Sequence, residues 1–247
     1  MRTSVPLLLC ALLRAASLAP ATRRRALGWA AGTAVGTAVA LPAPAFAADV
    51  NKFNKRLDQL GLPPVDSIPG GFRPVLSSVN QEQSLFVQFY SPDGWLVVKP
   101  SINTNGEDGT VSAGNYGKGD SAALFVSPLK PATDKAYYGK LIQGGLGQKG
   151  GGELFQEFKV KKVNPPAGAG AGPVTVDFSY ELLTGAGFIV ERKGVAAVTD
   201  VNGKSQALLA VTTSGRFKTL EPTLRTIAGS FKCFEKVGSV PTDTFED

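Results

Sequence analysis

The sequence predicts an α+β fold, with antiparallel β-strands in a sheet layered between α-helices, in a single domain. Short runs of alternating apolar and polar residues, separated by turn sequences, fill most of the chain after residue 84. Segments with helical periodicity stand before, among and after these runs, which favours a layered arrangement. Of the 247 residues, about 200 remain once a predicted export sequence is set aside, and this length suits one domain.

The first part of the chain has the pattern of an export signal. Three arginines, Arg23–Arg25, directly precede an uncharged stretch at residues 26–41. Alanines then occupy the −3 and −1 positions of a cleavage site, so we expect cleavage between Ala47 and Ala48. The paired arginines favour the twin-arginine route. An uncleaved membrane anchor is the alternative, because residues 26–47 are about long enough to span a bilayer.

Residues 1–21 precede this signal and contain two arginines and no acidic residue. This composition is typical of an organelle transit peptide. A transit peptide followed by an export signal is the arrangement for the thylakoid lumen of a chloroplast. The apolar run at residues 5–13 leaves a secretory signal as the alternative. We therefore expect residues 1–47 to be a bipartite targeting sequence.

Residues 48–83 form a predicted lead-in. Phe53, Leu57 and Leu60 share the spacing of one helix face, and Gly61 ends that helix. Prolines and glycines follow as far as residue 74, which predicts an extended or looping arm with some apolar residues packed on the domain. A flexible linker is the alternative.

Strands are predicted from residue 84 onward. Residues 85–90 are aromatic and β-branched, and the turn at residues 91–94 leads into a short strand that starts with Trp95. We expect Trp95 to anchor the core, with ligand stacking as the alternative. Further strands are expected at residues 110–116, 122–126, 153–163, 174–183, 188–199 and 206–213, the last two joined as a hairpin by the turn at residues 200–204.

Two later segments have helical periodicity. At residues 133–146, Tyr138 and Leu141 share a face, and Thr133 is a candidate N-cap. At residues 220–231 the apolar side chains follow a stripe suited to packing on a sheet. Residues 237–247 are expected to be a flexible tail.

Charge, histidine and cysteine content exclude several function classes. All five charges of residues 1–47 are arginines, so 21 basic residues face 20 acidic ones in the remaining chain, and a nucleic-acid partner is not expected. Histidine is absent, which excludes Ser-His-Asp and Cys-His catalysis and every imidazole metal site. Cys233 has no second cysteine beyond the targeting sequence and is expected to be a buried small hydrophobe. We do not expect an enzyme.

The order of these elements resembles the PsbP family. The segment Phe89–Trp95 (Phe-Tyr-Ser-Pro-Asp-Gly-Trp) resembles the family's opening signature, an aromatic strand running into a Pro-x-Gly-Trp turn. Residues 124–129, before the first helix of the domain, and residues 224–234, in its closing helix, resemble two further family stretches. The likeness covers about residues 85–234, so a PsbP-like domain is expected at residues 84–236.

The resemblance implies a PsbP-like fold and a non-catalytic role in photosynthesis. The family's founding member is an extrinsic lumenal subunit of photosystem II that helps retain calcium and chloride at the oxygen-evolving centre. Its relatives include assembly or maintenance factors for photosystem I, photosystem II or the NDH-like complex. This chain lacks histidine, and its lead-in does not look like the subunit's binding arm. A PsbP-domain paralogue in the chloroplast thylakoid lumen, extrinsic to the membrane and bound to a photosystem, is therefore favoured.

The polar loop at residues 103–109 is a candidate cation site. Asn103, Asn105, Glu107 and Asp108 supply side-chain oxygens, which are the ligands that calcium prefers. The spacing falls short of an EF-hand, so the site would be weak, and an ordinary solvated turn is the alternative. No other cofactor is expected.

Lys159, Lys161 and Lys162 form the densest basic cluster beyond the targeting sequence. They are a candidate docking surface for an acidic membrane subunit, because complementary charge guides encounter and register. A charged edge strand that discourages aggregation is the alternative.

A second class of function also stays open. The chain would then be a lumenal small-ligand or lipophile-binding protein, or an enzyme of unusual chemistry, using a cleft beside the sheet. An apolar pocket with a few convergent polar groups would favour this alternative.

Overall fold

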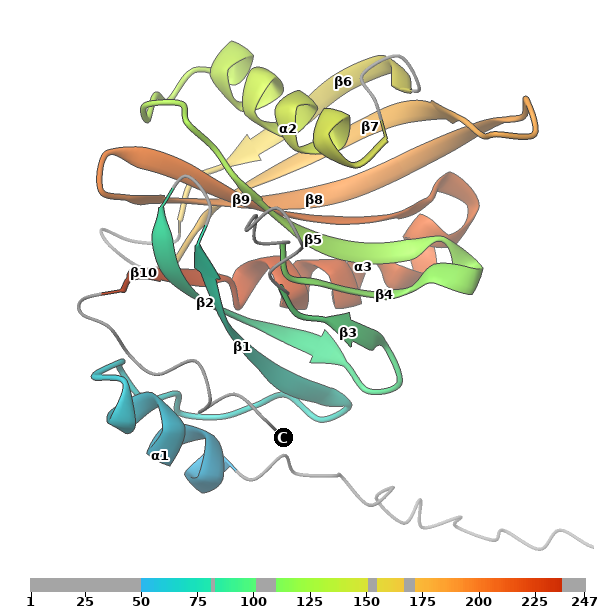
Figure 1. Cartoon of the computed structure of the whole chain (residues 1–247). Coiled ribbons are helices and arrows are strands. Elements are labelled where there is room, and N and C mark those ends of the chain that lie inside the picture. The colour runs from blue at the N-terminus through green and yellow to red at the C-terminus, as the bar shows by residue number, and fades with distance from the viewer. Residues whose placement is uncertain (1–49, 81–82, 101–109, 151–154, 167–171, 237–247) are drawn as a thin grey trace, which may run out of the picture. The chain divides into compact units, whose positions relative to one another are not determined.

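The computed structural model describes residues 50–80, 83–100, 110–150, 155–166 and 172–236, which form the elements labelled in Figure 1. In chain order these are α1 (Val50–Gln59), β1 (Phe72–Asn80), β2 (Ser84–Pro92), β3 (Leu96–Val98), β4 (Ser112–Asn115), β5 (Asp120–Val126), α2 (Lys135–Gly150), β6 (Phe155–Asn164), β7 (Val174–Leu183), β8 (Ile189–Val201), β9 (Lys204–Thr213), α3 (Ser214–Gly229) and β10 (Lys232–Glu235). The targeting sequence, with its cleavage site at Ala47 and Ala48, and the tail at residues 237–247 lie outside the described residues.

The strands form two sheets. The large sheet has the order β3-β4-β5-β9-β8-β7-β6, and the small sheet has the order β1-β2-β10. Every pair of neighbouring strands is antiparallel. The predicted α+β class is confirmed, but the sequence did not indicate that the strands divide between two sheets.

Helices and the small sheet cover both faces of the large sheet (Figure 1). Because side chains alternate along a strand, Leu208 and Ala210 of β9 face α3 and the small sheet, whereas Leu209 faces α2. The helix α1 packs on the outer face of the small sheet. The layers are therefore α2, the large sheet, the small sheet together with α3, and α1.

The lead-in is more ordered than a looping arm. Its helix is confirmed as α1, and Gly61 beyond it adopts a φ of 66° that favours glycine. Residues 72–80, however, form β1, which pairs along its whole length with β2. Pro74 is tolerated there because β1 is an edge strand of the small sheet.

The closing segment also differs from the prediction. The helix α3 starts at Ser214, six residues before the predicted start at residue 220, and contains Pro222. Residues 232–235, for which no strand was predicted, form β10. An ion pair of 2.7 Å between Arg216 Nη2 and the buried Asp120 Oδ2 ties the first turn of α3 to β5. This contact comes from a strand distant in sequence, so local periodicity did not reveal the start of the helix.

Two local signals had mixed outcomes. The hairpin between β8 and β9 is confirmed, and its two-residue turn, Asn202–Gly203, has positive φ at both positions, as a type I′ turn requires. At the start of α2 the capping residue is Asp134, not Thr133, because the Asp134 Oδ1 accepts a 2.8 Å hydrogen bond from the Tyr137 backbone N–H.

Candidate functional site

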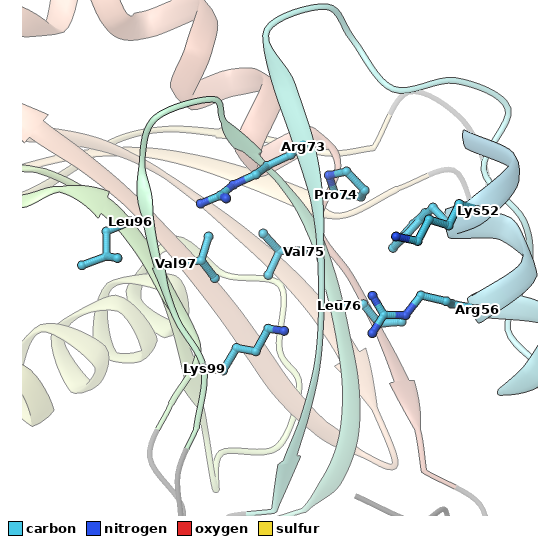
Figure 2. Close-up of a pocket in the computed structure, with 10 residues that line it drawn as sticks. Lys52, Arg56, Arg73, Pro74, Val75, Leu76, Leu96, Val97 and Lys99 are labelled. Carbon is cyan, nitrogen blue, oxygen red and sulfur yellow. The ribbon is translucent and has the colours of Figure 1, made fainter. Parts of the chain in front are cut away.

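A basic pocket lies between the exposed edges of the two sheets. β1 is an edge strand of the small sheet, β3 is an edge strand of the large sheet, and α1 adds to the wall. The pocket has a volume of about 730 Å³. Figure 2 shows its residues, which are Lys52, Phe53, Arg56, Arg73, Pro74, Val75, Leu76, Leu96, Val97 and Lys99.

Four of these ten residues are cationic, and none of the ten is acidic. Lys52 and Arg56 stand four residues apart on α1 and therefore share one helix face. Arg73 belongs to β1, and Lys99 follows β3. In Figure 2 the Arg73 side chain reaches toward β3, and the Lys99 side chain reaches back toward β1. The four residues thus bring positive charge to one opening from three separate segments.

The cations of the pocket stand on a fixed framework. Arg73 Nη2 donates to the backbone carbonyl of Trp95, which links β1 to the turn before β3. On α1, the Asn54 amide donates to the Val65 carbonyl and accepts from the Val65 N–H, each over 2.9 Å. Leu57 of α1 is fully buried against the small sheet. These contacts hold the helix and both strands in place, so the backbone positions that carry the four cations are fixed relative to one another.

The pocket also presents apolar surface. Leu96 of β3, which lines the pocket, is 62% exposed although it is a large aliphatic residue. Val98 on the same strand does not line the pocket but is also exposed, to 44%. An apolar area bordered by charge is the usual anatomy of a protein–protein interface. The arrangement therefore suits binding of an acidic protein surface better than a chemical step.

The lysines predicted as a docking surface lie on β6, at the opposite edge of the large sheet. Lys159 Nζ is 2.9 Å from Glu157 Oε2, and this hydrogen-bonded ion pair raises the pKa of Lys159 and lowers the pKa of Glu157. The pairing of β6 with β7 has two register shifts in this region. Bulges and lysines are both devices that protect an edge strand. Docking through Lys159, Lys161 and Lys162 stays a prediction.

The proposed calcium ligands Asn103, Asn105, Glu107 and Asp108 lie outside the described residues, so calcium binding stays a prediction. Within the described ranges, no group of three or more cysteine, aspartate or glutamate residues is placed to hold a metal ion. In the same ranges, no helix is both long and apolar enough to cross a membrane.

A hydrogen-bonded chain of side chains resembles part of a catalytic arrangement but is enclosed. The Tyr137 hydroxyl donates to Ser205 Oγ, which in turn donates to the Asp200 carboxylate. Ser205 is completely buried, and burial raises the pKa of Tyr137. A substrate has no access to Ser205. These three hydrogen-bonded side chains therefore have a structural role, in which they link α2 to the β8–β9 hairpin.

Trp95 lies in the core, as the sequence predicted, whereas Cys233 is only partly buried as a residue. Trp95 belongs to the core beneath the small sheet, and Cys233 packs against the same cluster. Although the residue is partly exposed as a whole, burial raises the pKa of the Cys233 thiol. We therefore predict that Cys233 in a Cys10→Ser variant reacts with iodoacetamide at pH 8 far more slowly in the folded chain than in urea. Equal rates in both conditions would show that the thiol is not buried.

Comparisons with known proteins found similar solved structures but no matching family. No protein-family model matches the sequence, and no curated protein matches it. Among solved structures, the solution structure of cyanobacterial PsbP (CyanoP) from Synechocystis sp. PCC 6803 is similar with a TM-score of 0.42 and 18% identity, over 70% of this chain and 99% of that one. LpqN, involved in cell envelope biogenesis of Mycobacterium tuberculosis, is similar with a TM-score of 0.40 and 13% identity, over 66% of this chain and 91% of that one. Neither likeness bears on function.

The sequence did not indicate the basic pocket. Its four cations are spread over residues 52–99, and no single local cluster contains all of them. The spacing of Lys52 and Arg56 on the predicted helix was the one local signal, and it gives a shared face but not the strands that face it.

Proposed function

We propose that this chain is a non-catalytic, extrinsic protein of the thylakoid lumen that binds the lumenal face of a photosystem, with photosystem II as the favoured partner. The basic pocket carries the proposal, because it joins four cations and the exposed apolar side chain of Leu96 at the edges of two sheets. The predicted bipartite targeting sequence supports the compartment. The PsbP-like segment at residues 89–95 supports the choice of partner.

Charge and apolar surface have separate tasks in such a complex. Positive charge around the pocket steers the chain toward an acidic surface and fixes the register of docking. Exposed side chains such as Leu96 supply the apolar contact that excludes water from the interface. Binding of this kind weakens as salt rises, since exposed charges are screened.

Within this proposal, the chain acts as a PsbP-domain assembly or maintenance factor. A role as the photosystem II subunit that retains calcium and chloride is the narrower version, and it additionally requires the predicted calcium loop at residues 103–109. Photosystem I and the NDH-like complex are the other candidate partners.

Protease protection tests the proposed compartment. In thylakoids isolated from the source organism, the protein should resist added protease while the membranes are intact and be degraded once they are ruptured. A wash of ruptured membranes with about 1 M salt, where the Debye length is about 3 Å, should release it. Degradation in intact thylakoids would place it on the other side of the membrane. Resistance to release by salt would favour the uncleaved anchor.

Transport depends on the paired arginines in this account. Replacing Arg23–Arg25 by three lysines keeps the charge but removes the twin-arginine signal, so a form not cleaved before Ala48 should accumulate during import into isolated chloroplasts. Replacing Arg14 by lysine is the matched control and should leave cleavage before Ala48 intact, as mass spectrometry of the product would show. Normal processing of the triple variant would rule out the twin-arginine route.

A further inference from the structure

A second pocket, largely apolar, lies on the face of the large sheet that α2 covers, and nothing in the proposed function uses it. Its volume is about 470 Å³, within the range of about 300–1,000 Å³ that is typical of small-ligand sites. Small residues of β5, Ser121 and Ala123, leave room beside the end of α2. The apolar walls come from four strands and α2 and are formed by Ala123, Leu124, Leu146, Phe155, Leu182, Leu183, Leu209 and Val211.

Arg192 is the one charged residue among those that line this apolar pocket. It lies on β8 directly opposite Tyr180 of β7, which also lines the pocket. Because they are cross-strand partners, the two side chains lie on the same face of the sheet. Burial raises the pKa of Tyr180, and the positive charge of Arg192 opposes that shift. A cation and a phenol thus meet within apolar walls.

The guanidinium of Arg192 is only partly used by the protein. Its Nη2 donates to the backbone carbonyl of Gly119, while its Nε is buried and has no hydrogen-bond partner among the described residues. A buried polar group without a partner is rare in folded proteins and calls for an explanation such as an ordered water or a bound ion. The planar guanidinium fork matches a carboxylate group in geometry and charge.

Exposed apolar residues stand beside the pocket. The β7–β8 hairpin projects beyond the rest of its sheet (Figure 1), and at its tip Phe188 is 70% and Ile189 is 63% exposed. The turn is fixed by hydrogen bonds, since Thr184 N–H donates to the Phe188 carbonyl over 2.8 Å and Phe188 N–H donates to Thr184 Oγ1 over 3.0 Å. Thr184 also lines the pocket, so the exposed tip adjoins it. The exposed apolar tip thus lies next to the turn residues that line the pocket.

We propose that the apolar pocket binds a long-chain fatty acid, with the hydrocarbon chain against the leucine walls and the carboxylate on Arg192. Charge complementarity selects the head group, because a single cation balances a carboxylate but not a phosphate dianion. The volume suits one hydrocarbon chain. This binding activity goes beyond docking to a photosystem and is independent of it, since the basic pocket and the apolar pocket share no lining residue.

The test is a fluorescence titration of the full chain with cis-parinarate, a fluorescent fatty acid, followed by displacement with oleate. We expect saturable 1:1 binding that oleate reverses. Oleyl alcohol, which has the same chain without the charge, should compete about 10- to 100-fold less well, because hydrogen bonds to charged groups are the stronger ones. Oleyl phosphate should compete less well than oleate.

Matched variants separate this pocket from unspecific adsorption on the targeting sequence. Arg192→Met should weaken cis-parinarate binding about 10- to 100-fold and abolish the preference for oleate over oleyl alcohol, whereas Lys193→Met, a cation on the opposite face of β8, should change neither. Ala123→Leu fills the pocket and should reduce binding at least tenfold. Absence of saturable binding to the wild-type chain would overturn the proposal. Equal affinities for oleate and oleyl alcohol would do the same, and this comparison needs no variant to fold.

Discussion

Replacing Lys52 and Lys99 by glutamate is expected to weaken binding of the chain to photosystem II membranes by about tenfold or more at low salt. The two residues contribute charge from opposite walls of the basic pocket. Exposed ion pairs contribute about 0.2–1 kcal/mol each, and two reversals both remove attractions and add repulsions. A combined loss of about 1.4 kcal/mol or more corresponds to tenfold. Rebinding of purified variants to salt-washed membranes measures the effect.

Two further double variants make this experiment specific. Lys135→Glu with Lys140→Glu changes the net charge equally on α2, which covers the other face of the large sheet, and should bind as the wild type does. Lys161→Glu with Lys162→Glu tests the β6 edge. The difference in binding affinity between the wild type and the Lys52→Glu, Lys99→Glu variant should shrink as salt rises, because the Debye length falls from about 10 Å at 0.1 M to about 3 Å at 1 M. Loss of binding in the β6 variant alone would move the docking surface to that edge.

Replacing Gly194 by alanine is expected to lower the free energy of unfolding by about 3 kcal/mol. Gly194 lies in the middle of β8, directly between Phe178 on β7 and Val211 on β9. An added Cβ would stand 2.7 Å from the Ala210 carbonyl oxygen, from Phe178 Cζ and from Val211 Cγ1. The backbone oxygen has no room to move in a central strand, so the sheet must distort.

Gly215→Ala is the matched control for this variant. Gly215 lies in α3, and nothing stands within 4 Å of an added Cβ. Because alanine favours a helix over glycine by about 0.8–1 kcal/mol, this variant should be at least as stable as the wild type. Urea unfolding followed by circular dichroism compares the three proteins. A loss below 1 kcal/mol in Gly194→Ala would show that the close contacts relax without difficulty.

Most strands were predictable because alternation is a local signal. In residues 174–183 every second residue is apolar, and the strand predicted there has the same bounds as β7. The division into two sheets was not predictable, because alternation indicates that a strand has a buried face but does not indicate which strand pairs with it. β10 pairs with β2 from the far end of the domain, and only four residues carry its signal.

The basic pocket shows the same limit. A cluster such as Lys159–Lys162 is visible in the sequence because its members are neighbours, and the structure places it on an edge strand with one lysine paired to Glu157. The cations of the pocket come together only when α1, β1 and β3 meet, which depends on contacts between distant segments. The surroundings of Arg192 could not be predicted from the sequence either, because its neighbours Tyr180 and Gly119 lie near it only in the folded chain.

Native electrophoresis of gently solubilised thylakoids tests the central proposal most directly. With an antibody against the mature chain, we predict that the protein migrates with photosystem II cores or their assembly intermediates and that a high-salt wash removes it from them. Migration with photosystem I or the NDH-like complex would keep the extrinsic role and change the partner. Recovery only as free protein, or its absence from thylakoids, would contradict the proposal.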